Sequence, residues 1–249
     1  MGEMIGKQSV KFAEAPYIFE GASVVGPKEG EGPLGKLFDV IEQDPMLGSK
    51  SWEEAESLLQ KETVQKLLLK SGLKKEDIRY IFAGDLLGQL IATTFGIMDY
   101  EIPFMGLYGA CSTMGEGLSL AAMMVAAGYG ENVIAMASSH FGSAERQFRF
   151  PLEYGNQRPF SATWTVTGCG AAIVTKRKGF ARITGVTTGK IIDYGVKDAQ
   201  NMGACMAPAA ADVIYNHLND FGTAPDDYDK IITGDLGYVG QAILIDLLK

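Results

Sequence analysis

Apolar stretches with strand character alternate along the chain with longer stretches of helical spacing. Residues 17–26 are rich in β-forming residues and predict a first strand. Ser51 and Glu54 match a capping box, apolar residues then recur at helical spacing, and Gly72 marks the end of this helix. The same reasoning predicts strands at 78–83, 102–107, 132–137, 170–175 and 181–186, and helices at 87–95, 111–128 and 208–220. Strands that alternate with helices indicate parallel βαβ units and an α/β fold.

Two of the predicted helices have distinctive features. The helix at 111–128 is apolar on nearly all sides, which is typical of a buried helix. The last helix contains Pro208, which we expect at its first position because a proline there gives up no helical hydrogen bond.

A set of six residues occurs twice in the chain. Each second member is numbered 150 higher than the first, in the pairs Gly72 and Gly222, Asp77 and Asp227, Ile81 and Ile231, Gly84 and Gly234, Asp85 and Asp235, and Leu86 and Leu236. Both copies predict a helix end, a loop and a buried strand that ends in Gly-Asp-Leu. A chance match between two common α/β units is the alternative to a duplication.

A duplication predicts two halves, at 1–178 and 179–249. The first half continues well beyond its Gly-Asp-Leu, whereas little chain follows the second. We therefore expect the second half to be incomplete and the 249-residue chain to be poorly stable by itself.

Composition narrows the class of protein. The formal charge of −8 argues against general nucleic-acid binding, which needs a concentrated basic surface. Three cysteines suit a reducing compartment better than a disulfide framework, and no spacing typical of a metal site is present, so we expect no metal and no cofactor. The most apolar stretch, at 118–128, is too short to cross a bilayer, which predicts an intracellular protein without a transmembrane segment of its own.

Cys111 is the first candidate functional residue. It lies in the run GLYGACSTMGEGL, between a predicted strand and the apolar helix. The helix dipole stabilises a thiolate at this end, and Gly109, Gly115 and Gly117 allow a ligand or another backbone to come close. We therefore expect a functional pocket around Cys111; a buried structural cysteine is the alternative.

Further candidates lie between 140 and 160. Arg149 and Arg158 occur among aromatic residues, and guanidinium groups bind carboxylates while aromatic faces suit a flat ring. A solvated loop or a subunit interface is the alternative for this segment. His140 follows a predicted strand and is a candidate for the pocket, with a capping or interface histidine as the alternative.

Several long motifs resemble known families. The run IPFMGLYGACSTMGEGL, with the later VIAMASS, resembles the nucleophile region of the thiolase and ketoacyl-synthase superfamily, and TVTGCGAAIV resembles the strand that closes its first half. Within it, SSHFGSAERQFRFPLEYGNQRPFSATWTVTG and GPKEGEGPLGKLFD resemble the stage V sporulation protein AD family of endospore formers. This resemblance implies thiolase-like duplicated βαβ halves in a layered α/β/α/β/α arrangement, with the C-terminal part absent.

The resemblance also implies a function. It suggests a non-catalytic sporulation protein that binds dipicolinate, or its calcium complex, for uptake into the developing spore, with links to transport and germination. Membrane proteins of the same sporulation operon would be its partners, holding it at the periphery of the spore inner membrane, and the full-length protein would be a homodimer. The ligand residues would be drawn from Cys111, His140, Arg149, Arg158 and Asp235.

An acyl-transfer enzyme with Cys111 as its nucleophile is the alternative. Ketoacyl synthases place a histidine just after the strand that matches 231–233, where this chain has Asp235. An ionised carboxylate donates no hydrogen bond to a thioester oxygen, so it is a poor oxyanion-hole member. The sequence therefore favours binding over catalysis. A purely structural subunit of a membrane assembly is a third alternative.

Overall fold

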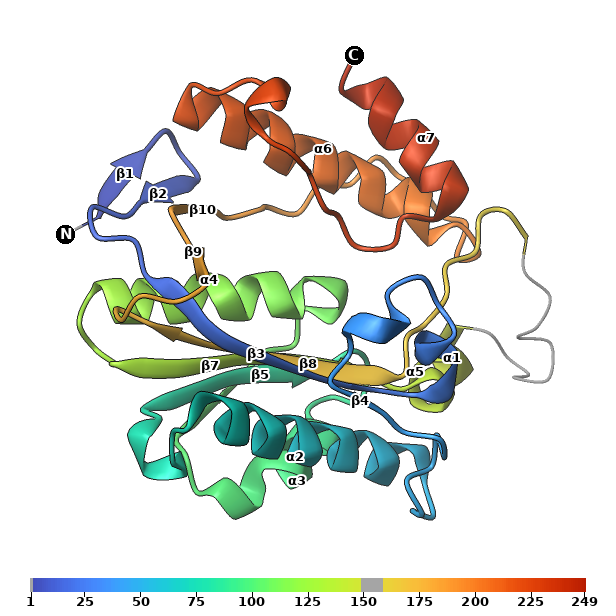
Figure 1. Ribbon diagram of the computed structural model, residues 1–249. Coiled ribbons are helices and arrows are strands. Elements are labelled where there is room, and N and C mark those ends of the chain that lie inside the picture. Colours follow the sequence, from blue (N-terminus) through green and yellow to red (C-terminus); the bar gives the residue numbers. More distant parts are fainter. Residues whose placement is uncertain (1, 149–158) are drawn as a thin grey trace. The chain divides into compact units, whose positions relative to one another are not determined.

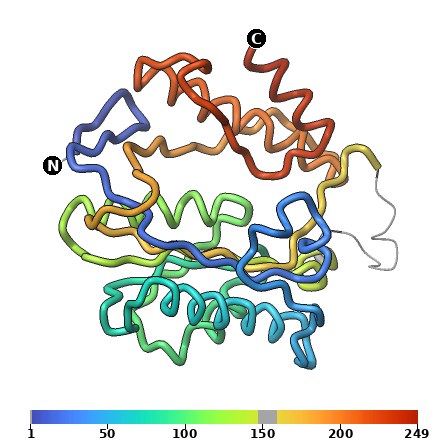
Figure 2. The backbone as a smooth tube through the Cα atoms, in the orientation of Figure 1, coloured from blue at the N-terminus to red at the C-terminus, as the bar shows by residue number. Residues whose placement is uncertain are grey.

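The computed structural model describes residues 2–148 and 159–249. Its contacts divide the chain into two compact units. The first unit contains Glu14–Gln147 and Thr165–Ile183, and the second contains Gly2–Ala13, Phe148–Trp164 and Thr184–Lys249. Figures 1 and 2 follow the chain through both units from the N-terminus to the C-terminus.

A seven-stranded mixed sheet forms the centre of the first unit. Its order is β4-β3-β8-β7-β5-β6, with β9 beside β3. The strands are β3 (Tyr17–Val25), β4 (Val40–Ile41), β5 (Tyr80–Asp85), β6 (Phe104–Gly106), β7 (Asn132–Ser139), β8 (Gly168–Thr175) and β9 (Ala181–Arg182). β5 pairs in parallel with both β6 and β7, which confirms the predicted βαβ units, whereas β8 pairs antiparallel with β3 and β7.

Helices cover both faces of this sheet. Figure 1 shows α4 on one face and α2 with α3 on the other. The helices of this unit are α1 (Pro27–Gly30), α2 (Trp52–Ser71), α3 (Ile91–Ile97), α4 (Thr113–Ala126) and α5 (Phe141–Phe148). The main core lies under α2, where Leu59 and Leu67 pack with Ile81 and with apolar residues of β7 and β8.

The predicted ends of α2 are confirmed, with one difference in its cap. The Ser51 hydroxyl accepts the backbone N–H of Glu54 at 3.2 Å, and Gly72 ends the helix in the left-handed conformation, with φ of 68°. The Glu54 carboxylate, however, accepts the backbone N–H of Lys50 instead of that of Ser51. The cap therefore satisfies the same helix end but is not the reciprocal box that the sequence predicts.

α4 is buried along one face only. Its fully buried positions are Thr113, Gly117, Ala121, Ala122 and Val125, which recur at helical spacing. Leu118, Met123 and Met124 remain half-buried. The prediction of a helix that is buried on all sides is therefore wrong for this structure, because the face that carries these larger apolar side chains is only partly covered.

The second unit combines a small antiparallel sheet with two helices. Its sheet has the order β1-β2-β10. Its elements are β1 (Glu3–Ile5), β2 (Ser9–Lys11), β10 (Gly185–Thr187), α6 (Met202–Phe221) and α7 (Gly237–Leu247). The strand predicted at 181–186 is therefore divided between β9, in the first unit, and β10.

α6 begins earlier than the sequence predicts. The side chain of Asn201 caps it by accepting the backbone N–H of Ala204 at 3.2 Å, and Pro208 lies inside the helix. The prediction of Pro208 at the first helical position is therefore wrong, because an effective asparagine cap precedes it. α6 crosses α7 closely at two glycines, since a Cβ on Gly240 would lie 2.6 Å from the Cα of Gly203.

The sequence repeat is matched by repeated local structure. α2 and α6 each have 20 residues, and their bounds differ by the same 150 positions as the sequence motifs. Both are followed by a left-handed glycine, with φ of 68° at Gly72 and 63° at Gly222. Asp77 and Asp227 each accept the backbone N–H three residues earlier, at 2.8 Å in both copies.

The strand predicted in the second copy is absent from the described structure. Ile81 and Phe82 of β5 are buried, with exposed fractions of 0% and 3%, whereas Ile231 and Ile232 are exposed by 47% and 86%. β5 has β6 on one side and β7 on the other, but no strand in the described residues pairs with 230–235. The prediction is wrong here because a strand needs a hydrogen-bonding neighbour as well as a suitable sequence.

Candidate functional site

Cys111 lies on a tight turn between β6 and α4. The 3-10 helix Ala110–Ser112 leads directly into α4, and the Cys111 side chain is exposed. Ala110 has a φ of 48°, a left-handed conformation that is uncommon for residues other than glycine. The Ser112 hydroxyl donates to the carbonyl of Gly109 at 2.8 Å and stabilises the turn. The structure therefore presents Cys111 outward at the start of a helix, in a strained backbone.

Neighbouring glycines allow this turn to pack against the sheet. A Cβ on Gly84 would lie 2.0 Å from the carbonyl oxygen of Leu107. A Cβ on Gly109 would lie 2.7 Å from the Glu116 carboxylate. Gly115 has open space around the same position. The close approach predicted for the glycines of this run therefore occurs at Gly109, and also at Gly84 in the first Gly-Asp-Leu.

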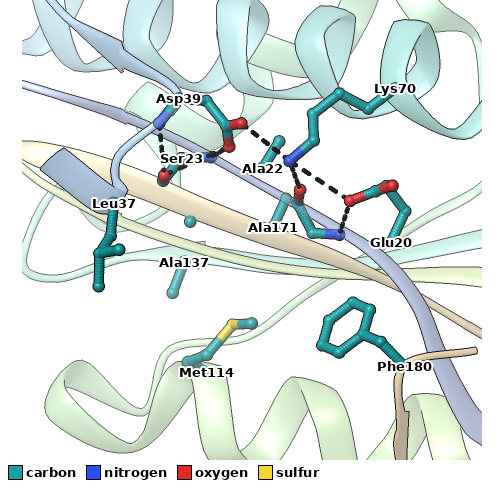
Figure 3. A pocket seen from close by; sticks show the side chains of 12 residues that line it. Glu20, Ala22, Ser23, Leu37, Asp39, Lys70, Met114, Ala137, Ala171 and Phe180 are labelled. Carbon is teal, nitrogen blue, oxygen red and sulfur yellow. Dashed lines mark hydrogen bonds and ion pairs between the residues drawn. The ribbon is translucent and has the colours of Figure 1, made fainter.

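A pocket of about 530 Å³ lies beside the sheet of the first unit, and sequence reasoning missed it. Met114, from the first turn of α4, lines this pocket together with Leu37 and Phe180 (Figure 3). Lys70 is its basic residue: the ammonium group donates to Asp39 at 2.8 Å and forms an ion pair with Glu20 at 3.3 Å. We call it the Lys70 pocket.

The charges of the Lys70 pocket are already balanced by the protein. Burial alone would lower the pKa of Lys70, but hydrogen bonds to Asp39 and Glu20 raise it above its ordinary value. Burial alone would raise the pKa of Asp39, and its hydrogen bonds with Lys70 and the Ser23 backbone lower it. Because two carboxylates face one ammonium group, this pocket is a poor site for an anionic ligand such as a dicarboxylate.

His140 is a buried capping residue. Its Nε2 lies 2.8 Å from the carbonyl oxygen of Pro45 and must donate to it, so Nδ1 is free to accept the backbone N–H of Gly142 at 3.0 Å. Burial lowers the pKa of His140. The neutral ring therefore holds the start of α5 against residue 45, as in the capping alternative of the sequence analysis.

Asp235 lies in the second unit and is exposed. Its carboxylate accepts the backbone N–H of Gly237 at 2.9 Å and that of Trp164 at 3.2 Å. It lines a pocket of about 640 Å³ whose other lining residues include Trp164, Tyr238 and Gln241. In this structure the Asp235 carboxylate therefore acts as a hydrogen-bond acceptor for two backbone N–H groups.

The predicted site residues are thus distributed between the units. Cys111 and His140 belong to the first unit and Asp235 to the second. Arg149 and Arg158 lie outside the described residues. Within the first unit, Cys111 is exposed on its turn and His140 is buried at its cap. Among the described residues, no group of three or more histidine, cysteine, aspartate or glutamate side chains is arranged to hold a metal ion.

A buried polar network is a further feature that sequence reasoning missed. Glu56 on α2 accepts the hydroxyl of Ser138 at 2.7 Å and that of Ser143 at 2.9 Å. Gln60 donates to Ser138 at 2.7 Å and to Thr93 at 3.0 Å. Burial raises the pKa of Glu56 to about 7. The signal in the sequence was polar residues on the inner face of α2, but their partners are distant in the chain.

The comparison with protein families identifies the chain. The sequence model for stage V sporulation protein AD (SpoVAD) matches residues 6–249. The chain belongs to this family. The stage V sporulation protein AD of Bacillus subtilis (strain 168) is 43% identical over 247 residues, which is 99% of this chain and 73% of that protein. Membership of the SpoVAD family confirms the resemblance found in the sequence and supports a role in sporulation.

Solved structures with low sequence identity show the fold. The priming β-ketosynthase of the R1128 polyketide pathway matches with a TM-score of 0.61 at 13% identity, covering 100% of this chain and 81% of that one. The 3-oxoacyl-[acyl-carrier-protein] synthase III of Aquifex aeolicus VF5 matches with a TM-score of 0.61 at 12% identity, covering 94% and 80%. The thiolase-like fold predicted for SpoVAD-type sequences is therefore confirmed. In the described residues, no helix has the length and apolar character needed to cross a membrane.

Proposed function

We propose that this chain is a non-catalytic binding protein of spore formation that recognises dipicolinate, or its calcium complex, for uptake into the developing spore. Its family membership supports the sporulation role. The observation that carries the binding role is the exposed Cys111 on its strained turn, which offers a ligand backbone groups at a helix start. Asp235, where the related enzymes have a histidine, already accepts two backbone N–H groups.

Calorimetry with dipicolinate, in the presence and absence of calcium, tests this proposal. We expect saturable binding that Cys111→Ala weakens by about ten-fold, the loss of roughly one hydrogen bond or contact. Cys205→Ala is the matched control, because Cys205 is also exposed but lies in the second unit. Absence of heat at ligand concentrations well above millimolar would overturn the dipicolinate assignment.

Acyl transfer is the second candidate, and the exposed thiol of Cys111 is the observation in its favour. Mass spectrometry after incubation with an acyl-thioester separates the two candidates. A covalent acyl group on Cys111 that is absent from Cys205 would support the enzyme and contradict the non-catalytic proposal. An unmodified protein that still binds dipicolinate would support binding.

We further propose that the protein acts as a homodimer beside membrane proteins of its operon, at the periphery of the spore inner membrane. An apolar stripe supports self-association: Ile91, Phe95 and Met98 are exposed by 52%, 60% and 58% and recur at helical spacing. β6, beside this stripe in sequence, is the outer strand of the sheet. Two outer strands related by a two-fold axis are able to pair.

Analytical ultracentrifugation tests the dimer. Phe95→Lys should shift the population to monomer, because a charge in an apolar interface is costly. Ile191→Lys is the control, since Ile191 is 97% exposed in the second unit. A parent protein that stays monomeric at micromolar concentration would contradict this arrangement.

A further inference from the structure

Basic side chains gather at one end of the sheet of the first unit. The register places Tyr17 beside Thr175, Thr175 beside Asn132, and Val133 beside Tyr80, so residues adjoining these positions share that end. The loops that join α4 to β7 and β8 to β9 lie there, on the left in Figure 1. The basic residues of this end are Arg79, Lys176, Arg177, Lys178 and Arg182, and we call them the basic end.

The basic residues of the basic end outnumber the acidic residues that lie close to them in sequence. All of its side chains are exposed, and none forms an ion pair with another residue of the described parts of the chain. Glu76, Asp77 and Glu131 are close in sequence and offset part of this positive charge. In a chain of net charge −8, such a cluster creates a local positive potential that favours an anionic partner.

The cations are held in place by aromatic rings. The guanidinium groups lie over rings of β3 and β5: Arg177 over Phe19 at 4.4 Å, Arg79 over Tyr80 at 5.2 Å and Arg182 over Tyr17 at 5.9 Å. Arg177 also donates to the side chain of Asn132 at 3.2 Å. Such contacts limit the motion of long side chains, so binding through them costs less conformational entropy.

Two large aromatic side chains are exposed on the same loops. Phe180 is exposed by 71% and Tyr129 by 68%. The loop before Phe180 is fixed to β3, because the Phe180 backbone N–H donates to Ile18 at 3.1 Å and Gly179 approaches so closely that a Cβ would lie 2.1 Å from the same carbonyl oxygen. Both rings therefore remain exposed, and that of Phe180 also borders the Lys70 pocket (Figure 3).

We propose that the basic end binds the surface of an anionic bilayer directly. Its lysines and arginines would lie among the headgroups, with Phe180 and Tyr129 at the boundary with the acyl chains. Exposed aromatics beside cations are typical of interfacial membrane contacts. A phosphate backbone of a nucleic acid would use the cations but would leave both rings in water, so the bilayer is the partner that uses the whole surface. This contact needs neither dipicolinate nor a partner protein.

Vesicle sedimentation of the whole chain, without dipicolinate, tests the proposal. The parent should bind vesicles rich in phosphatidylglycerol at low salt and leave phosphatidylcholine vesicles unbound. Removing one basic residue lowers partitioning by roughly five-fold, so the triple variant R79Q/K176Q/K178Q should lose about 100-fold. The control K36Q/K197Q/K230Q removes the same charge from exposed lysines elsewhere and should bind as the parent does.

A second variant tests the contribution of the Phe180 ring to vesicle binding separately from that of the basic residues. Phe180→Ala should lower binding to anionic vesicles by roughly ten-fold, because a large apolar side chain no longer enters the interface. It leaves the charges in place, and Phe180 is exposed, so the thermal midpoint should be unchanged. Three results would overturn the proposal: a parent that ignores anionic vesicles, equal losses in the triple variant and its control, or tighter binding to duplex DNA than to the vesicles.

Discussion

The three cysteines of the chain have different surroundings, and their reactivity should differ accordingly. Burial raises the pKa of Cys169 to about 12, whereas Cys111 and Cys205 are exposed. We expect iodoacetamide to label Cys111 first, because it lies at the start of α4, then Cys205, and Cys169 only after unfolding. Peptide mass spectrometry over time measures the order. Labelling of Cys169 in the folded protein, or of Cys205 before Cys111, would contradict this description.

Glu56 should make stability depend on pH. Burial, aided by the charge of Asp85, raises the pKa of Glu56 from 4.5 to about 7, so the folded state holds a proton that the unfolded chain releases earlier. The resulting stability is complete below about pH 4.5 and is lost as the pH rises through about 7. Between pH 5 and pH 8 the free energy of unfolding should fall by about 2–3 kcal/mol relative to Glu56→Gln.

Urea unfolding at several pH values measures this difference. Glu76→Gln is the matched control, because Glu76 is exposed and its substitution should leave the pH profile of the parent unchanged. A parent whose stability rises from pH 5 to pH 8 relative to Glu56→Gln would show that Glu56 is ionised throughout.

Single residues were predictable where the chemistry is local. The Ser51 cap and the Gly72 terminus depend on neighbours within four positions, and both were predicted from the sequence. Glu56 was not, because the two serines that bind it are 82 and 87 residues away. The cap at His140 remained one of two alternatives, since only the fold brings Pro45 to its ring.

At the level of elements, the matched helices α2 and α6 allow a paired experiment. Gly72 and Gly222 both have a positive φ, and a Cβ at either position would have open space around it. Gly72→Ala and Gly222→Ala should therefore each cost about 1 kcal/mol, from backbone strain alone. Gly170→Ala is the control, with open space and no positive φ. Denaturant unfolding measures all three, and unequal losses at the paired glycines would show that the two helix ends differ.

The predicted boundaries of helices and strands were wrong where tertiary contacts determine them. Asn201 starts α6 well before Pro208, and the stretch at 181–186 pairs with β3 at its beginning and with β2 at its end. The apolar pattern does not show which strand will be the neighbour. The antiparallel direction of β8 is likewise decided by the course of the chain and not by its own residues.

For the whole molecule, the α/β class and the parallel strands followed from periodicity, and the resemblance of long motifs added the family and the thiolase-like fold. Less of the candidate site could be predicted from the sequence. Cys111 was placed at a strand-to-helix turn as predicted. The Lys70 pocket was not foreseen, because α2, β3 and the segment before β4 contribute one charged residue each.

Residues 230–235 should influence how whole molecules associate. Ile232→Lys is expected to raise the protein concentration at which turbidity appears, because it places a charge in an apolar segment exposed by 86% at this residue. Ile191→Lys is the control, because Ile191 is exposed by 97% and lies outside both copies of the repeat. Light scattering at increasing concentration compares them, and equal effects would mean that exposure alone governs association.

The exposed segment at 230–235 also bears on whether the protein forms fibrils. It carries the composition of β5 without β5's neighbours, so its backbone groups are available to any extended peptide that comes alongside. Pairing between chains through such a segment is the first step of ordered fibril growth. Charged or proline substitutions within 230–235 should therefore act as gatekeepers, slowing seeded fibril formation while leaving the sheet of the first unit unchanged.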